Sequence, residues 1–309
     1  MQSGSKPFLA IWMVAYNHEK FLEQAVESVM MQETDFDFKL FIGEDCSKDN
    51  TREICEKLQQ RHPGKIKLFL NSQNLGPNKN ALQIYNACFK SGAKYIAMLE
   101  GDDYWTDKFK LRKQVDFLEN NPDFVLCFHK TSILKPDGAI IEDFLTKVPE
   151  NYQTIETLAK FGNYIHTPTV VYRNVLEAIP FEFEFSPIGD FFLYMMLAQY
   201  GKLKYLEENM SVYRYGVGMF SGKSELKMAL SNLKLFSCLL PCISDEKVQK
   251  IIFERYVEAF SLLDIAIANQ YKNHFVSDHI LFRSLKFFKS NAGNPQLILK
   301  KVFNKVFRY

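Results

Sequence analysis

The sequence predicts an α/β fold, a mostly parallel sheet with helices on both faces, followed by a helical C-terminal region. Continuous apolar runs such as residues 8–15 are typical of strands covered on both faces. Helical patterns alternate with such runs through the first half of the chain, as in parallel sheets. We therefore predict a first domain over residues 1–218 and a helical region over 219–309, divided where Gly and Ser cluster.

The elements of the first domain follow a regular order. Strands are expected at 8–15, 39–43, 66–70 and 94–98, each followed by a helix, at 18–31, 51–61, 78–90 and 107–119. The pattern then loosens, with strands at 124–128, 169–172 and 210–214 and a helix at 191–199. Further helices are expected at 225–240, 245–271 and 276–290.

Charge is distributed unevenly along the chain. The formal charge is +2, but from His279 onward there are seven Lys or Arg and no acidic residue, so the rest carries −5. Residues 297–309 place an apolar stripe opposite basic side chains, which predicts an amphipathic helix. Such a helix either makes peripheral contact with a membrane through residues 280–309 or packs on the protein or on a second copy in a homo-oligomer.

The six cysteines and the apolar runs bear on localisation. The cysteines form no C-x-x-C pair, which favours reduced thiols in a cytosolic protein. No apolar run approaches the roughly 20 residues that a spanning helix needs. We expect a cytoplasmic protein, peripheral on the inner face of the membrane if the tail binds lipid.

Polar loops follow the first four predicted strands, and such loops meet at one edge of a parallel sheet, where ligands bind. Asp102 and Asp103 follow the fourth strand, and Gly101 before them lets the backbone approach a ligand. Two carboxylates suit Mg²⁺ or Mn²⁺ bound together with phosphate oxygens. The alternative is a solvated turn or a helix cap. Glu44 and Asp45 either form a turn or include one carboxylate that accepts the imino hydrogen of a base such as uracil.

Five short motifs together resemble one known family. They occur at residues 9–17, 43–51, 74–76, 99–103 and 189–192, in the order and near the spacing of family 2 glycosyltransferases with the GT-A fold. The likeness covers residues 7–216, about two thirds of the chain.

The resemblance implies an inverting glycosyltransferase of hexosyltransferase type that uses a nucleotide-sugar donor, usually a UDP-sugar. Asp103 matches the metal-binding Asp and Asp190 matches the general base of the family, although relatives often have Glu where Gly189 stands. Without the family, Asp190 reads as a helix cap. The residues that the resemblance places at the nucleotide are Ala15, Tyr16, Asn17, Glu44, Asp45, Asn80 and Asp102.

One departure concerns the diphosphate. Relatives often carry a His two residues after the position of Arg214, where this chain has Gly216. Arg214 and Lys223 are therefore candidates for phosphate contacts, and His166, before the strand at 169–172, is a candidate for the acceptor site.

Other classes fit less well. A dehydrogenase would need G-x-G-x-x-G after the first strand, where residues 15–18 contain no glycine. Processive synthases usually carry Q-x-x-R-W and membrane spans, so transfer of one sugar to a saccharide or lipid-linked saccharide is expected. The alternative is a non-catalytic module that binds nucleotide-sugars, and neither reading involves nucleic acid.

Overall fold

The computed structural model describes residues 6–217 and 224–270. Contacts within the chain divide it into two units, Met1–Gly222 and Lys223–Tyr309. The predicted helix at 276–290, the basic tail and Lys223 lie outside the described residues.

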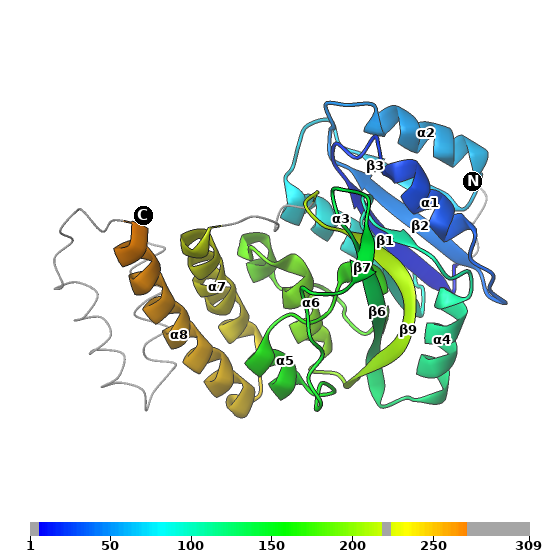
Figure 1. The fold of residues 1–309 in the computed structure, drawn as a ribbon. Coiled ribbons are helices and arrows are strands. Elements are labelled where there is room, and N and C mark those ends of the chain that lie inside the picture. The colour runs from blue at the N-terminus through cyan, green and yellow to red at the C-terminus, as the bar shows by residue number, and fades with distance from the viewer. Residues whose placement is uncertain (1–5, 218–223, 271–309) are drawn as a thin grey trace. The chain divides into compact units, whose positions relative to one another are not determined.

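A single sheet runs through the first unit (Figure 1), with strand order β3-β2-β1-β4-β8-β6-β9-β5 and β7 paired to β6. Its first four strands are parallel, as predicted, and the second half is mixed because β8 runs antiparallel to both β4 and β6. The strands are β1 (Leu9–Ala15), β2 (Phe38–Glu44), β3 (Ile66–Leu70), β4 (Tyr95–Met98), β5 (Tyr104–Trp105), β6 (Phe124–Leu134), β7 (Ile140–Glu142), β8 (Val171–Arg173) and β9 (Lys202–Arg214).

Helices cover both faces of this sheet because its strands are apolar on both sides. Along β1, alternate residues from Leu9 to Ala15 join one core with buried side chains of α1, α2 and α4. On the other face, Trp12 stacks on Tyr85 of α3 at 4.8 Å between ring centroids. The helices of the first unit are α1 (Leu22–Met30), α2 (Thr51–Arg61), α3 (Pro77–Lys90), α4 (Lys110–Asn120), α5 (Ile155–Phe161) and α6 (Gly189–Leu197).

The largest departure from the predicted elements is β9, which has 13 residues where only 210–214 were expected. Exposed polar residues at 207–209 conceal the strand in the sequence. Asn209 pairs with Lys130 of β6, whereas residues 207 and 208 fall in a shift of register after Leu206. This is typical of a β-bulge. The short elements β5, β7 and α5 were also not predicted.

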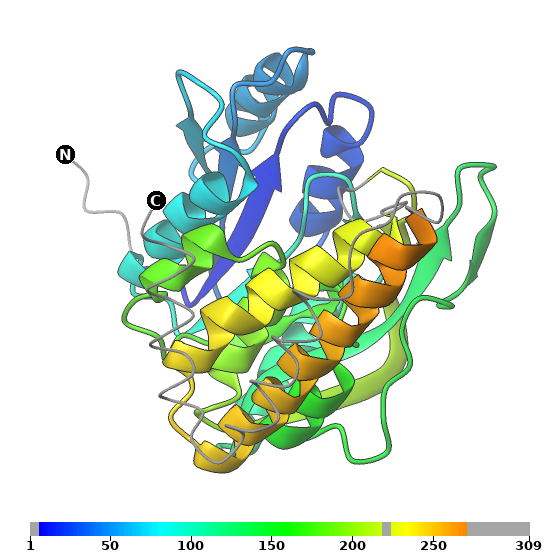
Figure 2. The ribbon, with the colours of Figure 1, turned by 90° about the vertical axis from the view of Figure 1, so that its left-hand side faces the viewer.

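The described part of the second unit contains the helices α7 (Glu225–Leu239) and α8 (Glu246–Gln270). A 3-10 turn at Leu240–Cys242 joins them. They lie side by side, yellow and orange in Figure 2, and the Arg255 guanidinium lies 4.8 Å from the centre of the Phe236 ring. Across both described ranges, no helix is long and apolar enough to pass through a bilayer.

Candidate functional site

The carboxyl ends of β1, β2 and β4 bring three polar loops together. Ala15 is in register with Glu44, and β1 also pairs in parallel with β4. Backbone bonds continue past the strand ends, since Asp45 N donates to Ala15 O at 3.1 Å and Gly101 N donates to Val14 O at 3.0 Å. The sheet therefore fixes the relative positions of the loops that the sequence singled out.

The loop after β1 is held by the loop after β2. Asn17 N donates to Ser47 Oγ at 3.0 Å, and Asn17 Oδ1 accepts from Lys48 N at 2.9 Å. Asn17 has φ = 55°, a left-handed conformation that Asn tolerates. The Tyr16 side chain next to it is 37% exposed, so its ring is open to a partner.

Asp45 binds the loop that follows β3. Its carboxylate accepts from Leu75 N at 2.8 Å, Gly76 N at 2.9 Å and Asn71 Nδ2 at 3.0 Å. Asp45 is buried, and these bonds hold the 71–76 loop next to the end of β2. The carboxylate can accept further hydrogen bonds, but three donors of the protein already bind it.

Three residues expected at the nucleotide make contacts within the protein, and their expected role stays a prediction. Glu44 is fully buried and binds Ser47 N and the Arg52 side chain. Asn80 is buried and bridges Gly43 O and Asn71 Nδ2. Ala15 has its side chain in the core, and its carbonyl accepts a hydrogen bond from Asp45 N. All three residues therefore fix the shape of the loops around the proposed nucleotide site.

The loop after β4 gathers a second set of carboxylates. Oxygens of Glu100, Asp102 and Asp103 all lie within 4.8 Å of one another. Asp103 Oδ1 accepts from Arg214 N at 2.8 Å, whereas the buried Oδ2 of Asp103 has no hydrogen-bond partner among the described residues. Asp103 thus has a buried oxygen without a partner in the described part of the chain, and two other carboxylates lie beside it. Mg²⁺ and Mn²⁺ prefer such oxygen ligands.

Electrostatics in this cluster oppose ionisation. Burial raises the pKa of Glu100 to about 8, and the Asp102 and Asp190 charges add to the rise. Burial, followed by the charges of Asp102 and Glu100, also raises the pKa of Asp103 well above its usual range. A cation would relieve both effects, because it returns solvation and charge balance to the carboxylates.

The Arg214 side chain is buried and bonded within the protein, and its contact with phosphate stays a prediction. The side chain lies between the rings of Phe21 and Tyr104, 4.8 Å from each centroid, and donates to Asp102 O and Gln24 Oε1. Arg214 therefore ties the end of β9 to the carboxylate loop.

His18 supports the same loop from the end of β1. A Cβ added at Gly101 would lie 2.8 Å from His18 Nδ1 and 3.1 Å from Val14 O, so only glycine fits there. Burial lowers the pKa of His18, which keeps the imidazole neutral near Asp102. The sequence offered no signal for this packing beyond the glycine itself.

Asp190 lies in the first turn of α6, and its role as a general base stays a prediction. Its Oδ1 accepts from Phe191 N and its Oδ2 accepts from Asn163 Nδ2, each at 2.8 Å. Burial raises the pKa of Asp190, and its charge acts on Glu100. The carboxylate is thus anchored as at a helix start, yet it shares the electrostatic field of the β4 loop.

His166 joins this group through partners that the sequence did not reveal. Its Nε2 lies 2.9 Å from Asp143 Oδ2, and its ring lies 4.9 Å from that of Tyr213 on β9. Burial, then the charges of Glu100, Asp103, Asp102 and Asp190, raise the pKa of Tyr213. Tyr213 therefore contacts the His166 ring and also responds electrostatically to the β4 carboxylates.

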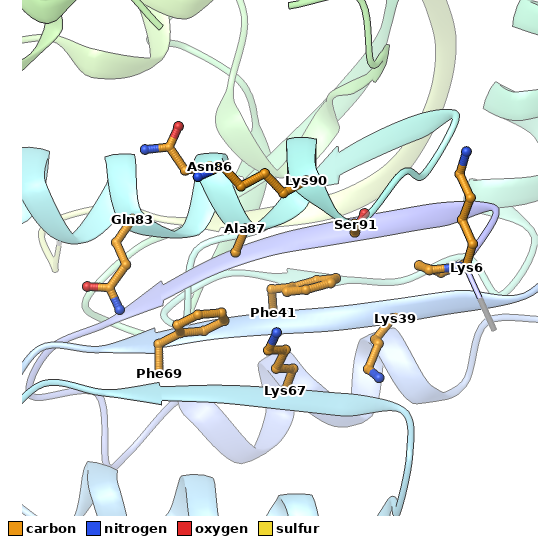
Figure 3. Close-up of a pocket in the computed structure, with 11 residues that line it drawn as sticks. Lys6, Lys39, Phe41, Lys67, Phe69, Gln83, Asn86, Ala87, Lys90 and Ser91 are labelled. Atoms are coloured by element: carbon orange, nitrogen blue, oxygen red, sulfur yellow. The ribbon is translucent and has the colours of Figure 1, made fainter. Parts of the chain in front are cut away.

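A separate hollow of about 490 Å³ lies between α3 and the strands β2 and β3 (Figure 3). It includes Lys39, Lys67 and Lys90, but none of the predicted site residues. Two of these lysines have a local explanation: Lys67 protects an edge strand, and Lys90 lies in the last turn of a helix. The acidic site is thus distinct from this hollow.

Comparison with known proteins identifies the family. The model of "Glycosyl transferase family 2" matches residues 10–179, more than half of the chain. The chain belongs to this family.

An uncharacterised protein of Mycobacterium tuberculosis is 32% identical over 206 residues, 67% of this chain and 58% of that protein. An uncharacterised glycosyltransferase of Nostoc is 30% identical over 211 residues, 64% of this chain and 62% of its own length. The chain thus spans about three fifths of these relatives.

Solved structures give this family 2 chain the GT-A fold that the sequence predicted. Staphylococcus aureus TarS in complex with UDP superposes with a TM-score of 0.59 at 18% identity, over 85% of this chain and 75% of that one. The mannosyltransferase PcManGT of Pyrobaculum calidifontis, in complex with GDP-Man and Mn²⁺, has a TM-score of 0.54 at 11% identity, over 98% and 88%. At these identities the likeness concerns the fold alone.

Proposed function

We propose that the chain is an inverting glycosyltransferase that moves one sugar from a UDP-sugar to a hydroxyl of a saccharide or lipid-linked saccharide. The observation that carries this proposal is the Glu100–Asp102–Asp103 cluster with the orphaned Oδ2 of Asp103, at the edge of the sheet where α/β proteins bind ligands. Solved structures of the same fold contain UDP, UDP-GlcNAc and, with Mn²⁺, GDP-Man, which supports a nucleotide-sugar donor.

The donor would occupy the ends of β1, β2 and β4. Tyr16 offers an exposed ring to the base, and Asp45 would accept an imino hydrogen in addition to the loop bonds it already makes. Asp103, with Asp102 and Glu100 beside it, would hold Mg²⁺ or Mn²⁺. Such an ion, when bound, neutralises charge that develops on the departing diphosphate.

The acceptor would approach from the side of Asp190. Its hydroxyl oxygen attacks the anomeric carbon as the bond to the diphosphate breaks, and the hydroxyl proton passes to the Asp190 carboxylate. The raised pKa of Asp190 favours this step, because a more basic carboxylate takes a proton more readily. A single displacement inverts the anomeric centre.

Titration calorimetry with UDP, GDP and TDP, with and without Mn²⁺, tests this proposal. We expect metal-dependent binding of UDP to the wild type and its loss in Asp103→Ala. Binding of no nucleotide under any condition would remove the donor site. Binding without release of nucleoside diphosphate from any UDP-sugar would favour the non-catalytic module, an alternative that the missing Glu before Asp190 supports.

A further inference from the structure

The pair formed by His166 and Asp143 has a geometry suited to substrate binding. The His166 and Asp143 side chains are only 10% and 14% exposed, so the contact between them is shielded from water. Asp143 also accepts from Thr146 Oγ1 and from Leu145 N. These donors, with His166, lower the pKa of Asp143 to about 2, against the effect of burial. Asp143 is therefore an ionised, fixed acceptor near neutral pH.

An ionised carboxylate fixes the tautomer of the imidazole. A carboxylate can only accept, so Nε2 of His166 must carry the hydrogen that is shared with Asp143. In the neutral ring, Nδ1 then keeps its lone pair and acts as an acceptor. Among the described residues no donor binds Nδ1. The pair thus presents one oriented acceptor atom that the fold does not use.

The surroundings of His166 place that atom beside the reaction. Asn163, three residues before His166, donates to Asp190, the proposed base, at 2.8 Å, and the His166 ring lies 4.9 Å from that of Tyr213. Tyr213 in turn responds to the carboxylates of the β4 loop. His166 precedes β8 and lies near the segment that holds Asp190. This is the side from which the proposed acceptor approaches, and not the side of the donor loops after β1 and β2.

We propose that His166 binds the acceptor saccharide by accepting a hydrogen bond at Nδ1 from one of its hydroxyls, with Asp143 as the positioning residue. This inference rests on the proposed glycosyl transfer and adds the acceptor's partner. The hydroxyl that receives the sugar still delivers its proton to Asp190, and a neighbouring hydroxyl of the same saccharide binds His166. The ligand is therefore a saccharide that offers a second hydroxyl besides the one that receives the sugar, which a simple alcohol does not replace.

Three variants of similar size separate binding from support of the fold. In His166→Gln the amide reaches the position of Nε2 and can still donate to Asp143, but no acceptor remains at Nδ1. In His166→Asn the amide lies near the position of Nδ1 and can accept there, while the bond to Asp143 is lost. Asp143→Asn keeps the size of the partner but allows its amide to donate to Nε2, which would move the ring hydrogen to Nδ1.

The probes are methyl glycosides of glucose, galactose, mannose and N-acetylglucosamine, titrated in the presence of UDP and Mn²⁺. We expect the ¹⁵N spectrum of the wild type to show an unprotonated Nδ1 on His166 that shifts with at least one glycoside. His166→Gln should weaken that glycoside about tenfold, since one hydrogen bond is lost, while UDP affinity stays unchanged. His166→Asn should retain part of the affinity, and Asp143→Asn should lose as much as His166→Gln.

His62→Gln serves as the control, because His62 pairs with Glu27 on the α1–α2 side. Three results would overturn the proposal: a hydrogen on Nδ1, no response of His166 to any of the glycosides, or equal glycoside affinity in the wild type and His166→Gln. Failure of UDP to bind the wild type would instead contradict the donor site, so the two failures are distinguishable.

Discussion

Two acidic loops at the same edge of the sheet differ in how their charge is used. At the end of β2 and the start of the next loop, Glu44 and Asp45 are buried and their carboxylates bind donors of the protein itself. In the loop after β4, Asp103 has one buried oxygen without a partner, and Glu100 and Asp103 have raised pKa values. The first pair of carboxylates mainly holds the protein's own loops together, whereas the second set keeps a buried oxygen without a partner among the residues that the structure describes.

The largest expected effect is in the β4 loop. Asp103→Asn should reduce turnover of the sugar nucleotide by about 100-fold or more, because an ion held there is worth several kcal/mol in the transition state. The free energy of unfolding should stay equal or rise, since Asn keeps the acceptor for Arg214 N and removes a buried ionisable group. Initial rates and urea denaturation of the same preparation measure both quantities.

Asp35→Asn is the matched control for this substitution, because Asp35 is exposed and its removal changes the net charge equally. If Asp103→Asn lost stability but kept its rate of turnover, Asp103 would support the fold as Asp45 does. The distinction between the two loops would then be wrong.

The converse change belongs to the β2 loop. Asp45→Ala leaves Leu75 N, Gly76 N and Asn71 Nδ2 without their acceptor, and we expect a loss of about 3 kcal/mol in the free energy of unfolding. Urea denaturation measures it, and nucleotide affinity should fall as well because the 71–76 loop loses its anchor. Full stability in this variant would show that the loop does not depend on Asp45.

The contrast between the loops could be predicted from the sequence only in part. Apolar runs and helical periodicity located the first four strands and their helices, because these signals are local. The same reasoning placed both acidic pairs at one edge of the sheet. It could not tell that Glu44 faces Arg52 and Asp103 faces no donor, because partners are decided by tertiary packing.

On the acceptor side, too, the sequence did not reveal which residues are in contact. His166 was singled out by its place before a strand, but Asp143 lies 23 residues earlier, after a hairpin that the sequence did not reveal. Tyr213 belongs to a strand whose first half was missed because its polar residues are exposed. Contacts between such distant segments have no periodicity or motif that a single sequence could show.

The smallest expected effect sharpens the comparison through pH. Burial raises the pKa of Glu100 to about 8, whereas an unfolded Glu titrates near 4, so between these values the folded state holds a proton that the unfolded state releases. The stability that this proton contributes is present at low pH and is lost as pH rises toward 8. Glu100→Gln does not titrate, so its stability relative to the wild type should increase from pH 5 to pH 8.

We expect this difference to grow by about 1 kcal/mol, because water screens a carboxylate that is only partly buried. Taking the difference between the two proteins removes the contributions of His18 and His129, whose lowered pKa values act in the opposite direction in both. Mn²⁺ should stabilise the wild type more at pH 8 than at pH 5, since the ion binds ionised carboxylates, and should stabilise Glu100→Gln less. A difference independent of pH would mean that Glu100 ionises normally and that the charge of the β4 loop is already satisfied by the fold.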